Sequence, residues 1–180
     1  MTAMFFKRVA VASATALLAA GLAVLNPGSA VAAPHLQAPP TVQLGYTDLA
    51  HPFTAYDVAD RDLPLGAWRD ATTRRPHVSR VYATFDVASL TGKRIIGGTV
   101  AIQESTAGDC TKRAIEIWQT RPVSRTPSWV SAPRALRKLD EITTAERCPG
   151  FITFDVATAV RDAVEHNQPR VSFEIRVPAR

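Results

Sequence analysis

Apolar and polar residues alternate at a period of two over much of the chain from residue 80 onward. Such alternation is typical of strands with one buried face. Four segments carry it without a break: RVYATFDV (80–87), AIEIWQT (114–120), GFITFDV (150–156) and RVSFEIRV (170–177). The last is the most regular, with apolar Val171, Phe173, Ile175 and Val177 on one face. The pattern therefore predicts four strands.

Two further segments have a weaker strand pattern. TVQLGY (41–46) is short, and RIIGGTVAIQE (94–104) places Ile96, Val100 and Ile102 in phase, with Gly97 and Gly98 marking a bulge or a close backbone approach. The segment 57–66, DVADRDLPLG, has the composition of a loop. The segment 121–133, RPVSRTPSWVSAP, contains three prolines and indicates an irregular loop anchored by Trp129. RALRKLDEI (134–142) has a short helical spacing.

The period changes once, in ATAVRDAVEHN (157–167). Here Ala159, Val160, Ala163 and Val164 fall on one helical face, which predicts a short helix near residues 157–166. Several short strands separated by turns, with one helix, predict an all-β fold, an antiparallel β-sandwich.

The N-terminus has the order of a secretory signal peptide. Lys7 and Arg8 precede an apolar stretch, and small residues follow at Ala30 and Ala32, which gives a mature start at Ala33. A retained membrane anchor is the alternative, since the apolar stretch is nearly long enough to span a bilayer. We expect cleavage and a secreted protein, with no membrane contact afterwards.

The domain boundaries follow from this assignment. Residues 1–32 are the signal peptide, 33–40 a proline-rich leader, and 41–180 one domain. Removing Lys7 and Arg8 lowers the formal net charge from +5 to +3. The remaining basic residues are interspersed with acidic ones, so we expect no nucleic-acid partner. The densest basic stretch, RDATTRR, is interpreted as a solvated loop.

Export places the two cysteines, Cys110 and Cys148, in an oxidising compartment, where paired thiols usually form a disulfide. Closing this loop would stabilise the fold by roughly 4 kcal/mol. A catalytic thiol would need a partner base, and a zinc site would need two further ligands at suitable spacing. The four histidines are scattered singly: His35, His51, His77 and His166. We therefore expect a disulfide rather than free thiols.

The succession of segments resembles the DNRLRE domain of secreted actinobacterial and archaeal surface proteins. The similarity covers roughly residues 41–180. The family's strand ending in F-D, its W-x-x-x-P loop and its helix after F-D-V correspond here to Phe85-Asp86, Trp129 to Pro133, and Asp155 to Val160. Its cysteine pair corresponds to Cys110 and Cys148. The resemblance implies a jelly-roll β-sandwich related to carbohydrate-binding modules.

The chain departs from that family in two ways. The naming motif, with its Asn, Arg and Glu run, does not occur as written. The family also continues past the strand similar to VSFEIRV to a further edge strand, whereas this chain stops at Arg180. A domain that lacks this strand would leave an open sheet edge, which could bind another chain by strand addition.

Three functions are compatible with these features. The first, implied by the resemblance, is a noncatalytic module that binds cell-wall or extracellular polysaccharide, or acts as a surface or adhesion unit. Sugars stack on exposed aromatic rings beside polar groups, which makes Trp118, Tyr82, Trp68 and Tyr46 the candidates for ligand binding. Trp118 is the best of them, because it shares its predicted strand face with Glu116 rather than with Ile115 and Ile117.

The second function is a calcium-stabilised structural module. Asp57, Asp60 and Asp62 offer oxygen ligands, although their spacing lacks the glycine and distal glutamate of an EF-hand loop. The third is a small polysaccharide-degrading enzyme with carboxylates drawn from Glu104, Glu116 and Glu174. The sequence contains no common serine or zinc hydrolase motif, so no catalytic residue is assigned and we expect no enzyme.

Overall fold

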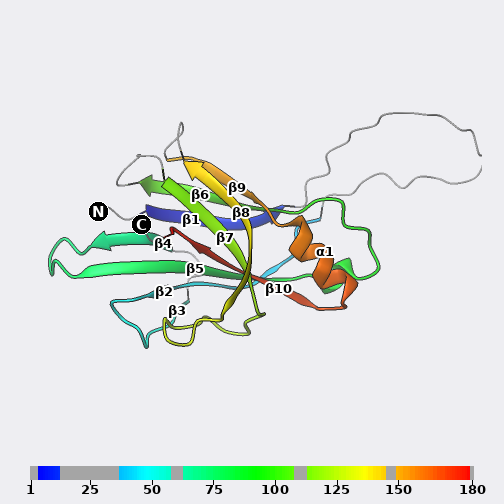
Figure 1. The fold of residues 1–180 in the computed structure, drawn as a ribbon, viewed down its shortest axis with the longest axis horizontal. Helices are drawn as coiled ribbons and strands as arrows, with labels where there is room; N and C mark the ends of the chain where they lie inside the picture. Colours follow the sequence, from blue (N-terminus) through cyan, green and yellow to red (C-terminus); the bar gives the residue numbers. More distant parts are fainter. Residues whose placement is uncertain (1–3, 13–36, 58–62, 108–112, 145–148, 179–180) are drawn as a thin grey trace, which may run out of the picture.

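The computed structural model describes residues 4–12, 37–57, 63–107, 113–144 and 149–178. In these residues the elements are β1 (Met4–Ala12), β2 (Thr41–Asp48), β3 (Tyr56–Asp57), β4 (Leu63–Arg69), β5 (Pro76–Asp86), η1 (Ala88–Leu90), β6 (Thr99–Ala107), β7 (Arg113–Thr120), β8 (Ala135–Thr144), β9 (Phe151–Asp155), α1 (Ala157–Glu165) and β10 (Arg170–Arg176). Every described strand pair is antiparallel. The predicted all-β, sandwich-like fold is confirmed (Figure 1).

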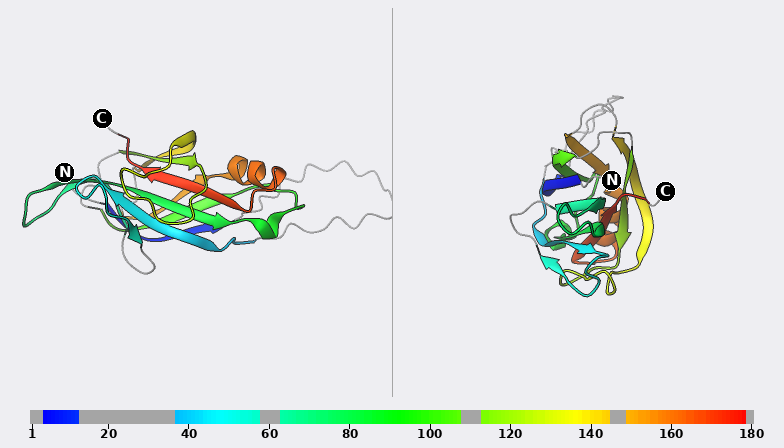
Figure 2. Two further views of the ribbon diagram at one scale, coloured as in Figure 1. Left: turned by 90° about the horizontal axis from the view of Figure 1, so that it is seen from below. Right: turned by 90° about the vertical axis from the view of Figure 1, so that its left-hand side faces the viewer.

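The strands form one continuous sheet that turns back on itself into two facing layers. Its order is β8-β7-β10-β5-β4-β1-β6-β9, with β2 paired to β5 and β3 to β2. The end-on view in Figure 2 places β1 and β8 on opposite sides of the molecule. The two ends of the order approach each other, because the backbone N–H of Asp155 on β9 donates to Asp140 Oδ2 on β8 over 2.8 Å.

β4 is the strand that passes from one layer to the other. Its first residues, Leu63 to Leu65, pair with β1, and its last, Gly66 to Arg69, pair with β5. The bend falls at Gly66, whose φ of +87° is strained for any residue with a side chain. A Cβ at this position would also lie 3.1 Å from Val177. The strand therefore passes from one layer to the other at a glycine, the residue that best tolerates this backbone conformation.

The core lies between the two layers and is mostly apolar, although the charged residue Glu104 on β6 is also buried, at 3% exposure. Most of the residues that alternation placed on inner faces are buried there: Val81, Ala83, Phe85, Val100, Ile102, Ile115, Ile117, Ile152, Phe154, Val156, Val171, Phe173 and Ile175. Two are not fully buried: Val177 packs against the core but is only partly buried, and Ile96 lies before β6 and is 54% exposed.

α1 closes one end of the sandwich (Figure 1). It buries the four predicted residues Ala159, Val160, Ala163 and Val164. Gly98 lets the helix start approach the sheet, because a Cβ there would lie 3.2 Å from Cα of Ala157. The sequence prediction of a close backbone approach at this glycine is confirmed.

Two secondary-structure predictions are wrong. LPLG (63–66), expected as loop, begins β4 because its leucines face the core at 1% exposure. RALRKLDEI, given a helical spacing, forms the edge strand β8. Its register with β7 skips Leu139, so Leu139 and Ile142 both pack against the core three positions apart. A β-bulge therefore produced a spacing that resembles a helix.

The loop 121–134 between β7 and β8, which includes the predicted irregular loop 121–133, covers the outer face of the sheet formed by β5 and β10 (Figure 2). Thr84 and Ser172 share a hydrogen bond of 2.7 Å beneath it, and the backbone N–H of Val123 donates to Ser172 Oγ over 3.2 Å. Gln43 Nε2 donates to Thr126 Oγ1 over 2.9 Å. Both faces of β5 and β10 are therefore buried.

The segment predicted to be the start of the signal peptide forms β1 in the full chain. It lies between β4 and β6 and pairs with both. Among the described residues, no helix is long and apolar enough to cross a membrane. Signal cleavage and secretion stay predictions.

The last described strand is not an open sheet edge, and strand addition at another edge stays a prediction. β10, the last strand, lies between β5 and β7 and pairs with both. β10 lies in the middle of its layer, so both of its edges are hydrogen-bonded to neighbouring strands. In the described part of the chain, β8 and β9 end the strand order instead.

The predicted disulfide lies outside the described residues, since Cys110 and Cys148 fall in 108–112 and 145–148. Each cysteine belongs to a segment that joins the two layers, one from β6 to β7 and the other from β8 to β9. The flanking residues Arg113 and Thr144 are register partners. Paired residues of neighbouring strands lie about 5 Å apart, so Arg113 and Thr144, which border the two connecting segments, lie close together. The disulfide itself stays a prediction.

Candidate functional site

Rings and donors from three segments of the chain meet at one end of the sandwich. We call this group the aromatic–histidine cluster: Tyr46, Asp48, His51, Tyr56, Trp68 and His77. β2 supplies two of the members, the β2–β3 turn and β3 supply two, and the β4–β5 hairpin supplies the other two. Register explains the meeting, since Tyr46 pairs with Tyr56 and Trp68 with His77.

Asp48 is the centre of the cluster and is buried, with 4% of its side chain exposed. Its Oδ1 accepts from the backbone N–H of Ala50 over 2.9 Å, which is an Asx turn at the end of β2. Its Oδ2 lies 2.6 Å from Nδ1 of His77 and 3.2 Å from Nδ1 of His51. One carboxylate oxygen thus holds two imidazole rings that are distant in sequence.

The rings form a chain of contacts around this carboxylate. Trp68 stacks on His77 with ring centroids 4.9 Å apart, and Tyr46 stacks on Tyr56 at 4.5 Å. His51 bridges the two stacks, 5.7 Å from His77 and 6.3 Å from Tyr56. Burial, followed by the charge of Asp48, raises the pKa of Tyr56 above its ordinary value.

The cluster therefore contains two of the four predicted ligand-binding aromatics. Trp68 lies at one end of the chain of rings and Tyr46 in the stacked pair at the other end. Both are half-buried. Nothing along the chain indicated the residues that lie between them in the cluster. Asp48 and His51 are three residues apart in a turn, but His77 is 29 positions from Asp48 and joins only through the pairing of β2 with β5.

An exposed phenylalanine adjoins the cluster and was also missed. Phe53 lies in the β2–β3 turn, two residues after His51, and is 83% exposed. Leu49, in the same turn, is 48% exposed. An aromatic ring this exposed has no packing role in the core, so it is available to a ligand.

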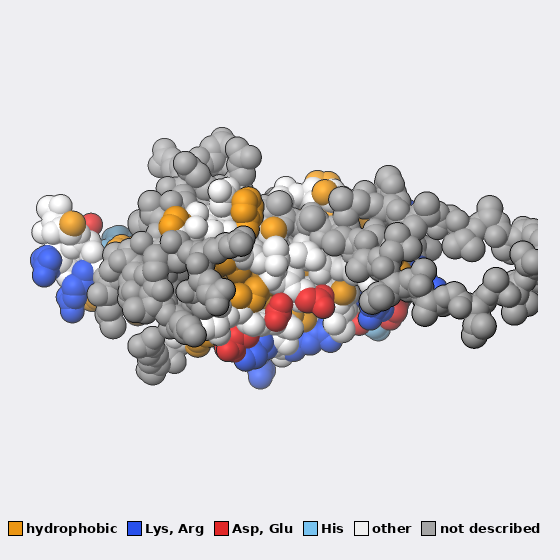
Figure 3. All heavy atoms as spheres, turned by 90° about the horizontal axis from the view of Figure 1, so that it is seen from above, with side chains coloured by type: hydrophobic (Ala, Val, Ile, Leu, Met, Phe, Trp, Pro, Cys, Tyr) orange, Lys and Arg blue, Asp and Glu red, His pale blue; other side chains and the backbone are white. Residues whose placement is uncertain are grey.

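The β4–β5 hairpin extends the site with positive charge. Figure 3 shows basic side chains gathered at its tip, where Arg69, Arg74 and Arg75 are exposed, as the solvated-loop interpretation of RDATTRR predicted. Asp70 accepts hydrogen bonds from the backbone N–H and hydroxyl of Thr73, which lower the pKa of Asp70 and fix the turn. Arg75 donates to the carbonyl of Ala50 over 2.5 Å, joining this hairpin to the β2–β3 turn.

The other two predicted ligand-binding aromatics lie elsewhere, on the outer face of β5 and β7. Tyr82 is 1% exposed beneath the loop 121–134, so its assignment as a stacking platform is wrong. Burial, followed by the charge of Glu174, raises the pKa of Tyr82. Trp118 shares its strand face with Glu116, as predicted, and is half-buried. The Arg176 guanidinium lies 4.2 Å from the Trp118 ring centroid and occupies one face of the ring.

The three glutamates considered for catalysis do not form one site. Glu116 and Glu174 lie on neighbouring strands, and Arg176 reaches Oε2 of Glu116 at 3.1 Å and Oε1 of Glu174 at 3.4 Å. Glu104 is on β6, in the other layer. A glycosidase needs its two carboxylates on either side of a bound sugar. Here the space between Glu116 and Glu174 holds an arginine.

The calcium prediction falls mainly outside the described residues, since Asp60 and Asp62 lie in 58–62. Asp57 is described, and its Oδ1 accepts a hydrogen bond from Thr126 Oγ1. This contact ties β3 to the loop 121–134. Asp57 therefore has a structural partner, and calcium binding stays a prediction.

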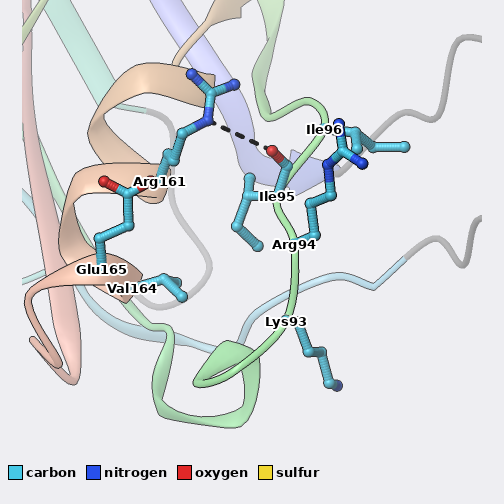
Figure 4. A pocket seen from close by; sticks show the side chains of 7 residues that line it. All are labelled: Lys93, Arg94, Ile95, Ile96, Arg161, Val164 and Glu165. Carbon is cyan, nitrogen blue, oxygen red and sulfur yellow. Dashed lines mark hydrogen bonds between the residues drawn. The ribbon is translucent and has the colours of Figure 1, made fainter.

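A pocket of about 400 Å³ lies at the opposite end of the molecule, between α1 and the segment before β6 (Figure 4). It is lined by Lys93, Arg94, Ile95, Ile96, Arg161, Val164 and Glu165. Arg161 Nε donates to the carbonyl of Ile95 over 3.4 Å. Its lining is mostly basic and apolar, and none of the predicted site residues belongs to it.

No protein-family model matches the chain, and no curated protein matches it. The resemblance to the DNRLRE domain therefore stays a prediction.

Proposed function

We propose that this protein is a noncatalytic module that binds extracellular or cell-wall polysaccharide with the aromatic–histidine cluster and Phe53. The observation that carries the proposal is the meeting of Trp68 and Tyr46 in one group of rings beside an 83% exposed phenylalanine. Sugar rings present apolar C–H faces, which stack on aromatic side chains, and hydroxyls, which pair with polar groups.

The polar requirement is met by neighbours of the rings. His51 has 42% of its side chain exposed, and Arg75 lies beside it with Nη1 3.5 Å from His51 Nε2. Imidazole and guanidinium groups can donate to sugar hydroxyls. The stacked pairs Trp68–His77 and Tyr46–Tyr56 hold their four rings on strands, so these rings lose little side-chain entropy when a sugar stacks on them.

The first prediction compares two exposed phenylalanines. Phe53→Ala should weaken binding by about tenfold, because it removes the most open stacking ring at the proposed site. Phe151→Ala removes a ring that is 75% exposed on β9, in the other layer, and should leave binding unchanged. Binding would be measured on a glycan array and by pull-down with insoluble cellulose, chitin and peptidoglycan.

Trp118→Ala serves as a second control, since Arg176 already covers one face of that ring. Loss of binding in Trp118→Ala with full binding in Phe53→Ala would move the site to the face of β7. If the wild-type protein binds no glycan on the array, sugar binding is contradicted. A surface or adhesion unit without a sugar ligand is then favoured.

A further inference from the structure

We infer that Asp48, His51 and His77 form a binding site for one divalent transition-metal ion of the zinc class. Each of the three residues offers one ligand atom, and these atoms all lie within 4.8 Å of one another. Asp48 Oδ2 faces Nδ1 of both histidines. This site does not depend on sugar binding, although it lies in the same cluster.

The distances fit such an ion. Two ligand atoms bound at about 2.1 Å to a tetrahedral ion lie about 3.4 Å apart. Asp48 Oδ2 is 3.2 Å from His51 Nδ1, close to that value, and 2.6 Å from His77 Nδ1. The second pair has to separate by less than about 1 Å to admit the ion, which a small rotation of the imidazole ring provides.

The ligand types select the class of metal. Two imidazole nitrogens and one carboxylate oxygen suit zinc, copper and related first-row ions, whereas calcium and magnesium require mostly oxygen ligands. The carboxylate is buried and offsets part of the ion's charge, with 4% of its side chain exposed. Calcium at Asp57, Asp60 and Asp62 would be a separate site.

The surrounding contacts hold the ligands in place. The backbone N–H of Ala50 fixes Oδ1 of Asp48, which leaves Oδ2 directed at the two rings. Trp68 stacks on His77 and fixes the plane of that ring. Such partners orient ligands before the metal arrives. Exposure rises from Asp48 through His77, with 11% of its side chain exposed, to His51 at 42%. The fourth coordination position therefore opens to solvent on the His51 side, as in zinc sites with three protein ligands.

Arg75 is the neighbour that opposes the ion. Its Nη1 lies 3.5 Å from Nε2 of His51, where it can donate only if that nitrogen carries no proton. A metal on Nδ1 moves the ring proton to Nε2, so Arg75 has to give up this contact. Without metal, the same rings donate to Asp48 as ordinary hydrogen bonds.

The test is a titration of the purified, untagged protein with ZnCl₂ by isothermal calorimetry, after removal of bound metal with a chelator. We expect one Zn²⁺ per chain. His51→Ala should weaken binding at least about tenfold, because it removes a ligand from an exposed turn on which the core does not depend. His166→Ala, an exposed histidine at the end of α1, should bind like the wild type.

Asp48→Asn is the second variant, because it retains Oδ1 for Ala50 while it removes the negative charge. It should weaken Zn²⁺ binding by a similar factor, with a circular-dichroism spectrum like that of the wild type. Absence of binding in the wild type, or equal binding in His51→Ala and His166→Ala, would overturn the inference. A protein that binds Zn²⁺ but no glycan would contradict only the proposed function, and one that binds glycan but no Zn²⁺ would contradict only the metal site.

Discussion

At the scale of single residues, the most informative position away from the candidate site is Glu116 on β7. It is 8% exposed and accepts hydrogen bonds from Trp118 Nε1 at 2.8 Å and Arg176 Nε at 3.1 Å. Burial by itself raises the pKa of a carboxyl group, but here the donors Trp118 and Arg176 outweigh it and hold the pKa of Glu116 below the ordinary 4.5. Trp118 was predicted as a sugar platform, and its indole N–H also has a structural partner in Glu116; sugar binding at Trp118 stays a prediction.

This shift predicts a dependence of stability on pH. Because the pKa of Glu116 is lower in the folded chain than in the unfolded chain, its contribution is present above about pH 4.5 and is lost as pH falls through the folded value. Glu116→Gln should lower the free energy of unfolding at pH 7 by about 1–3 kcal/mol. It should also make stability fall less steeply below pH 4.5, measured by urea unfolding at a series of pH values.

Glu165→Gln, at an exposed position on α1, provides the matched control and should keep the wild-type pH profile. Equal acid slopes for wild type and Glu116→Gln would show that the donors to Glu116 contribute nothing to the pH dependence.

At the scale of elements, the two layers are connected through β4, and the bend at Gly66 decides where that strand changes partner. Before the bend, β4 pairs with β1. After the bend, β4 pairs with residues 76–79 of β5, next to the part of β5 that pairs with β10. The bend also directs Trp68 to His77, which places the tryptophan in the aromatic–histidine cluster. A single backbone conformation thus determines both the corner of the sandwich and one side of the candidate site.

Gly66→Ala should therefore destabilise the protein by about 1–3 kcal/mol, through backbone strain and crowding against Val177. Gly92→Ala is the matched control, because Gly92 has a φ of +74° but open space around it. Chemical denaturation should show a larger loss for Gly66→Ala than for Gly92→Ala. Identical losses would mean that the contact with Val177 has no effect and that only the dihedral angle matters.

At the scale of the whole molecule, the position of β1 links the fold to the predicted processing of the chain. β1 fills the place between β4 and β6, yet residues 1–32 carry the pattern of a signal peptide. Cleavage would remove one strand from the middle of the sheet. β4 and β6 would then each lose a set of hydrogen bonds, because the two do not pair with each other among the described residues.

Hydrogen exchange on the full chain and on residues 33–180 tests this consequence. We expect the backbone amides of β6 between Thr99 and Ala107 to exchange faster in the shorter protein, because their register partners in β1 are gone. The helix α1 lies outside this pairing and should exchange alike in both. Equal protection of β6 would show that another segment takes the place of β1.

Much of the fold was predictable from the sequence. Alternation in 80–87, 114–120, 150–156 and 170–177 predicted β5, β7, β9 and β10, and the change of period predicted α1 with its buried face. These predictions succeed because burial on one face of a strand or helix imposes a period that local sequence carries. They fail at β4 and β8, where a corner and a bulge change the period within a strand.

The candidate site depended far more on tertiary structure. Trp68 and Tyr46 were chosen from the sequence as aromatic residues, but nothing along the chain related them to His77 or to Asp48. The pairing of β2 with β5 brings Asp48 to His77, and the loop 121–134 covers Tyr82. Sequence by itself determined which segments form strands, since that depends on local periodicity. Only the tertiary structure decided which faces are covered and which distant side chains meet, because both depend on strand order and loop placement.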